Sequence, residues 1–189
     1  MLKYLELTKS GLYNLLRTGI ESTPREATGQ LYGGEQRNGS LIIHNSYPLQ
    51  TATRKPTEVS YGNGEAVKRL KRLDEATGDY LIGGFHTHIK NDGEEKPCLK
   101  LSSSDIEFIE TDMDNFKISN WVEIILRLKS LNFQYPQKTN ILIKENPKKL
   151  IARIVDSPNH GYQAILCAYS LIRENGKTKI SELKVKRRR

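Results

Sequence analysis

Residues 80–88 read Tyr-Leu-Ile-Gly-Gly-Phe-His-Thr-His, an apolar run that changes into two histidines. A Gly-Asp pair comes directly before it and is typical of a turn, so the run predicts a buried strand. Side chains alternate between the two faces of a strand, which places His86 and His88 on the same face. Two imidazoles on one face of a strand can share a metal ion.

A carboxylate follows at the start of the next predicted helix, where residues 102–105 read Ser-Ser-Ser-Asp. The apolar side of this helix carries Ile106, Ile109, Met113 and Phe116. Serines and an Asp at this position are often only helix caps, and Ser104 with Glu107 fits a capping box. If the helix returns to the end of the histidine strand, Asp105 supplies a third ligand. Two histidines and one carboxylate leave a fourth tetrahedral position for water, the pattern of a catalytic zinc site.

A second carboxylate stands far upstream, immediately before another predicted strand. Residues 26–33 read Glu-Ala-Thr-Gly-Gln-Leu-Tyr-Gly. Together with the histidine strand and Ser102-x-x-Asp105, this order resembles the JAMM motif of the MPN (Mov34/MPN/PAD-1) metalloprotease family. The resemblance runs from about residue 5 to residue 128.

The resemblance implies a fold and a role for each residue. The fold would be a single MPN-type α/β domain with a mixed β-sheet between helices, an α/β/α layout similar to that of cytidine deaminases. His86, His88 and Asp105 would hold one zinc ion per chain. Glu26 would be the general base that takes a proton from the attacking water, and Ser102 would help stabilise the tetrahedral oxyanion.

The loop between the second histidine and the serine departs from the family. The family has proline directly after that histidine and seven residues before the serine, whereas this chain has isoleucine there and thirteen residues. A loop insertion costs little free energy, so the helix can still deliver the carboxylate. The insertion leaves Ser103 and Ser104 as alternatives to Ser102. Cys98, in the same loop, is either an extra zinc ligand or an ordinary loop thiol.

The other expected elements mix helices and strands within one domain, residues 1–183. Helices are expected from the N-cap Thr8 to Ile20 and over residues 65–77. Strands are expected at residues 28–33, 40–45, 122–128, 140–144, 150–155 and 162–172, and an Asn175-Gly176 turn leads to another at 179–185. Residues 184–189 read Lys-Val-Lys-Arg-Arg-Arg and are expected to be a disordered basic tail.

Most of the net charge of +8 lies in that tail. The preceding 183 residues carry 25 positive and 22 negative side chains, and a body so nearly balanced does not favour nucleic-acid binding. Because no apolar run approaches about 18 residues, we expect no membrane span. Two cysteines, Cys98 and Cys167, fit a reducing cytoplasm better than a disulfide framework.

The function that the resemblance implies is a zinc-dependent isopeptidase or peptidase acting after the C-terminal Gly-Gly of ubiquitin-like modifiers. Residues 46–61 and 89–101 would be the walls of the substrate groove, and proteasome-like or other MPN subunits are candidate partners. The rivals are a peptidase that processes sulfur-carrier proteins, a DNA-repair-associated relative, and a metal-binding MPN scaffold subunit without activity. A zinc deaminase is excluded because Leu101 stands where its second cysteine is needed. His44 and His160 are expected to be structural or exposed.

Overall fold

Strands predominate in the computed structural model, which describes residues 2, 4–49, 53–54, 59–60, 65, 68–69, 72, 76, 80–89, 99–146 and 148–188. The strands are β1 (Tyr4–Leu7), β2 (Thr28–Glu35), β3 (Ser40–Pro48), β4 (Thr53–Arg54), β5 (Val59–Ser60), β6 (Tyr80–Ile89), β7 (Asn120–Asn132), β8 (Asn140–Asn146), β9 (Lys149–Ser157), β10 (His160–Glu174) and β11 (Lys177–Arg187). The helices are α1 (Lys9–Ser22) and α3 (Ser103–Phe116). Of the helix expected at 65–77, the structure describes only separate positions, and these are helical.

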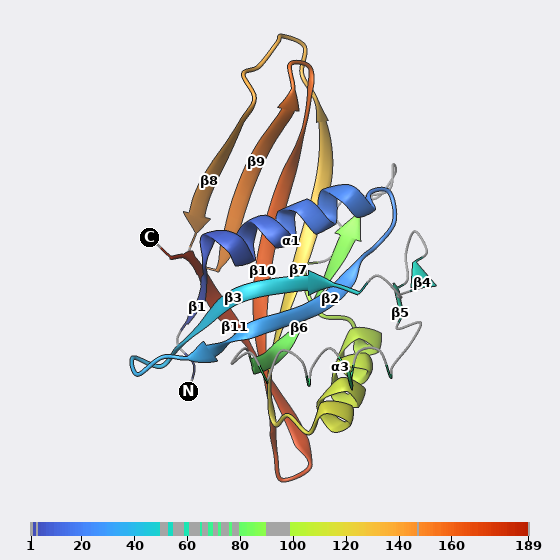
Figure 1. Cartoon of the computed structure of the whole chain (residues 1–189), viewed down its shortest axis with the longest axis vertical. Helices are drawn as coiled ribbons and strands as arrows, with labels where there is room; N and C mark the ends of the chain where they lie inside the picture. The colour runs from blue at the N-terminus through green and yellow to red at the C-terminus, as the bar shows by residue number, and fades with distance from the viewer. Residues whose placement is uncertain are drawn as a thin grey trace.

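Within the described residues, nine strands form one sheet in the order β11-β1-β3-β2-β6-β7-β10-β9-β8. Strand β11 also pairs with β10, which closes the first seven strands of this order into a barrel. Strands β9 and β8 extend the sheet beyond β10, and the long hairpins that they form project from one end of the molecule (Figure 1). The expected α/β/α layout, MPN-type and similar to cytidine deaminases, is therefore wrong: the chain is mostly β and its sheet closes on itself.

The closure depends on the two ends of the chain, which the sequence pattern did not join. Strand β1 pairs in parallel with β11, with Tyr4 opposite Lys184 and Leu7 opposite Arg187. The prediction of a disordered tail at 184–189 is also wrong. Residues 184–187 belong to β11, and Val185 is only 1% exposed. The many lysines and arginines of this segment suggested a solvated tail, but its positions alternate between buried and exposed, as is typical of a half-buried strand.

The two helices cover opposite faces of the sheet. Helix α1 begins where expected, because Thr8 Oγ1 accepts a hydrogen bond from Gly11 N at 3.1 Å. Its buried leucines join a core to which β1, β2, β3, β6, β7, β9, β10 and β11 contribute. Helix α3 packs Ile109, Met113 and Phe116 with Trp121 in a second core cluster. Neither helix, in the part of the chain described, is long and apolar enough to cross a membrane.

Several local predictions are confirmed. The strands expected at 28–33, 40–45 and 80–88 form, and each extends by one or more residues at its end. The turn between β10 and β11 has Asn175 at φ 51° and Gly176 at φ 72°, as an Asn-Gly hairpin turn requires. Local patterning therefore predicted the elements, whereas their assembly into a closed barrel was not predicted.

Candidate metal centre

Strand β6 directs His86 and His88 to the face of the sheet opposite the α1 core. The residues that alternate with them, Phe85 and Thr87, are both 0% exposed, and Phe85 belongs to the core cluster that contains α1. Because side chains alternate along a strand, the two histidines point to the other face, where both are half-buried. The predicted placement of the two imidazoles on one face is confirmed.

The same strand determines where Glu26 lies. Thr87 N donates a hydrogen bond to Ala27 O at 2.8 Å, and Ala27 N donates to Thr87 Oγ1 at 2.7 Å. These bonds hold the residue next to Glu26 against the histidine strand. The charge of the half-buried Glu26 carboxylate acts on the His86 imidazole, so the two groups lie within electrostatic range of each other.

Asp105 reaches the histidines from the first turn of α3. Its Oδ2 accepts a hydrogen bond from Ser102 N at 2.7 Å, and Ser102 Oγ accepts one from Asp105 N at 3.1 Å. The capping box therefore forms between Ser102 and Asp105, and not between Ser104 and Glu107 as expected. The other carboxylate oxygen, Oδ1, lies 3.8 Å from His86 Nε2.

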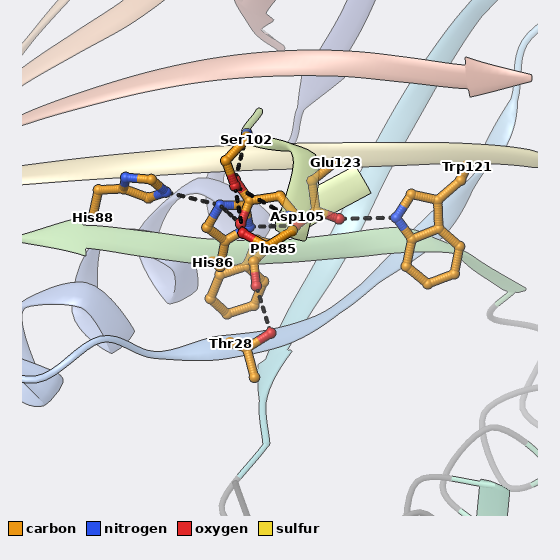
Figure 2. A network of polar contacts seen from close by, with 9 residues as sticks. Thr28, Phe85, His86, His88, Ser102, Asp105, Trp121 and Glu123 are labelled. Atoms are coloured by element: carbon orange, nitrogen blue, oxygen red, sulfur yellow. Dashed lines mark hydrogen bonds and ion pairs between the residues drawn. The ribbon is translucent and has the colours of Figure 1, made fainter. Parts of the chain in front are cut away.

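Three ligand atoms converge where β6 meets α3, as Figure 2 shows. One ligand atom from each of His86, His88 and Asp105 lies within 4.8 Å of the other two. The two Nε2 atoms are 3.0 Å apart. In a tetrahedral zinc site with ligand bonds of about 2.0–2.1 Å, neighbouring ligand atoms stand about 3.3 Å apart. Two of the three separations, 3.0 and 3.8 Å, lie within about 0.5 Å of this value, and the third is no more than 4.8 Å, so the three side chains could hold a zinc ion after moving closer together.

Glu123 on β7 is the residue of this centre that sequence reasoning missed. It is 4% exposed, and its Oε1 lies 2.8 Å from His86 Nδ1 while its Oε2 accepts a hydrogen bond from Trp121 Nε1 at 2.8 Å. Gly84, directly opposite Glu123 in the sheet, leaves room for this pair, because a Cβ there would lie 3.0 Å from Glu123 Oε2. A carboxylate at Nδ1 favours the tautomer with the proton on Nδ1, which leaves the Nε2 lone pair facing the cluster.

Burial and charge set the pKa values of the two histidines apart. The pKa of His88 is lowered from 6.5 to about 4, mainly by burial and further by the neighbouring His86, against the opposing charge of Asp105. Burial also acts to lower the pKa of His86, but the hydrogen bond to Glu123 and the surrounding carboxylates outweigh it and raise the pKa above 6.5. His88 is thus neutral near pH 7, the form in which imidazole binds metals.

The structure brings together most of the residues that the sequence singled out. His86, His88 and Asp105 form the cluster, while Ser102 is exposed beside it and lies 2.9 Å from Ser104 Oγ. Cys98 and most of the expected groove walls lie outside the described residues. The signal that could have revealed Glu123 is its position in β7, where it shares a face with Trp121 and alternates with the buried residues of the α1 core.

The comparisons with known proteins give information about the fold but none about the site. No family model and no curated protein matches the chain. Among solved structures, the chain is similar to the solution structure of protein DSY2949 from Desulfitobacterium hafniense, with a TM-score of 0.51 and 17% sequence identity. The match covers 97% of this chain and 94% of that one. At this low sequence identity the similarity indicates a shared fold only.

Proposed function

We propose that this chain is a zinc-dependent peptidase in which His86, His88 and Asp105 hold the metal ion. The observation that carries the proposal is the convergence of two imidazole nitrogens and a carboxylate oxygen within 4.8 Å. The two Nε2 atoms face each other at 3.0 Å, so they need either a shared proton or a cation between them. The donor set, two histidines and one carboxylate, is one of the sets that catalytic zinc sites use.

A zinc ion bound there would act as a Lewis acid and would make water acidic enough to lose a proton near neutral pH. The residues of the chain supply the remaining parts of the reaction. Glu26, half-buried and close enough for its charge to act on His86, accepts the proton of the attacking water and passes it to the leaving amine. Ser102 Oγ, at the start of α3, donates a hydrogen bond to the developing oxyanion.

The substrate class comes from the motif order, which resembles that of JAMM isopeptidases. We propose a peptide or isopeptide bond after the C-terminal Gly-Gly of a ubiquitin-like modifier. A sulfur-carrier protein is the alternative substrate, since such a carrier would present a similar extended tail. An extended tail of small residues can pass along a sheet by backbone hydrogen bonding and reach a recessed metal. A cytoplasmic location, expected from the cysteine content, stays a prediction.

The test combines metal analysis with cleavage by the full-length protein. Fusions that carry a reporter after the Gly-Gly of ubiquitin-like and sulfur-carrier proteins are incubated with wild type, His88→Ala and Glu26→Gln. We expect about one zinc per chain in wild type and cleavage that a chelator abolishes. His88→Ala should not cleave the fusions, and Glu26→Gln should cleave them at least about a hundredfold more slowly than wild type. Stoichiometric zinc with no cleavage of any fusion would instead support a metal-binding scaffold.

A further inference from the structure

A cavity of about 520 Å³ lies between the start of α1 and the end of β11, away from the residues of the metal centre. It is lined by Thr8, Lys9, Leu12, Tyr13, Arg187 and Arg188. In Figure 1 the C-terminal end of the chain comes beside the first turn of α1, which brings the two segments together. A volume in this range suits a small-molecule ligand.

The cationic residues of this cavity are held by the fold of the barrel. Arg188 N donates a hydrogen bond to Leu7 O at 2.8 Å, and Arg187 N donates to Glu145 Oε1 at 3.1 Å. On the other side, Thr8 N donates to Ile43 O at 3.0 Å, directly before Lys9. These bonds fix the backbone positions from which the three exposed positive side chains extend around one space.

The chemistry of the lining favours an anion. Among the described residues that line the cavity there are three cations and no carboxylate. Glu145 is the acidic group that approaches from β8, and its Oε1 accepts a backbone hydrogen bond there. Arginine forks bind phosphate through paired hydrogen bonds, and lysine adds a compact positive charge. Lys9 Nζ stands 5.8 Å from the centre of the Tyr13 ring, so an aromatic surface lies beside the charges.

We propose that this cavity is a binding site for an organic phosphate. Its three cations contact the phosphate groups, and the Tyr13 ring contacts the organic part of the ligand. The site uses none of the metal-centre residues, so it stands whether or not the chain proves to be a peptidase. It also gives a role to Arg187 and Arg188 of the basic C-terminal run, which the proposed peptidase reaction does not need.

Binding of ATP, inorganic pyrophosphate and adenosine to the full chain tests this site. Titrations at low salt, where screening of charge is weakest, follow the backbone amide resonances by NMR. We expect ATP and pyrophosphate to shift the amides of Thr8 to Tyr13 and of Arg187 and Arg188, and adenosine to leave them unchanged. Tighter binding of ATP than of pyrophosphate would support the contact with the organic part.

A matched pair of double variants separates a site from a diffuse charge effect. Arg187→Ala with Arg188→Ala should weaken ATP binding by about tenfold or more, because charge-assisted hydrogen bonds are lost. Lys177→Ala with Lys184→Ala removes the same charge from exposed positions of β11 outside the cavity lining and should change the affinity by less than about twofold. The proposal would be overturned if both pairs of substitutions weakened ATP binding equally. It would also be overturned if the amide resonance shifts were confined to His86 and His88, or if neither ATP nor pyrophosphate bound at millimolar concentration.

Discussion

Two clusters among the described residues combine histidine with a carboxylate, and they differ in what the imidazole nitrogens face. In the metal cluster (His86, His88 and Asp105), the His86 side chain is 12% exposed, and its Nε2 lies 3.0 Å from the Nε2 of His88. In the His160 cluster (Ser130, His160 and Asp156), the His160 side chain is 33% exposed. Its Nδ1 lies 2.9 Å from Asp156 Oδ1, and its Nε2 lies 2.9 Å from Ser130 Oγ.

The difference shows that contact alone does not indicate a metal site. Both nitrogens of His160 have oxygen partners, so the ring is satisfied without a cation, and water at the surface competes for the same hydrogen bonds. The order of the three residues resembles a Ser-His-Asp triad, but the group lies on exposed strand ends. In the metal cluster two imidazole nitrogens face each other at half-buried positions, and a cation between them would satisfy both lone pairs.

The largest expected effect separates the two histidine clusters directly. His88→Ala should remove most of the zinc, because it leaves the ion with two protein ligands. His160→Ala should keep the zinc content of wild type. Metal analysis after extensive dialysis measures both variants side by side. If His88→Ala retained its zinc in full, or if His160→Ala lost it, the two clusters would have been assigned the wrong way round.

The next effect concerns the proton acceptor. Glu26→Gln keeps the size of the side chain but removes its ability to take a proton, so turnover should fall by about a hundred- to ten-thousand-fold. Zinc content and melting temperature should remain close to wild type, because the proposed site does not use Glu26 as a ligand. Asp156→Asn makes the same chemical change in the His160 cluster and should leave turnover unchanged. Loss of zinc from Glu26→Gln would show that Glu26 is a ligand after all.

A smaller effect is expected from the carboxylate behind His86. Glu123→Gln retains a hydrogen-bonding group but no longer favours the tautomer with the proton on Nδ1, so the Nε2 lone pair is less often presented to the metal. Zinc affinity should fall by about 10- to 100-fold, as for other groups that orient metal ligands. Competition with a calibrated chelator measures the dissociation constant. An affinity equal to wild type would mean that Glu123 serves the packing of Trp121 alone.

The smallest effect compares two serines. Ser102→Ala removes the N-cap of α3 and should lower the free energy of unfolding by about 1 kcal/mol. Ser130→Ala removes an exposed hydroxyl from His160 and should change it by less than about 0.5 kcal/mol. Denaturant titration of both variants measures the difference. Equal stabilities would show that the Ser102–Asp105 capping box contributes little to holding α3 in place.

The sequence predicted what short-range patterns determine. Alternation placed His86 and His88 on one face, and the helix-start pattern placed Asp105 in the first turn of α3. It did not predict the barrel, because the pairing of β1 with β11 joins residues from opposite ends of the chain. Glu123 was missed for a similar reason: its contact with His86 arises only when β7 lies in register beside β6.

X-ray absorption at the zinc edge of the full-length protein tests the central claim most directly, since it reports the atoms bound to the metal. We predict nitrogen and oxygen ligands at about 2.0–2.1 Å, with the scattering pattern of two imidazoles. The same spectrum of Glu26→Gln should be unchanged. A sulfur ligand at about 2.3 Å, which would point to a cysteine such as Cys98, or the absence of stoichiometric zinc would contradict the assignment of His86, His88 and Asp105 as the metal centre.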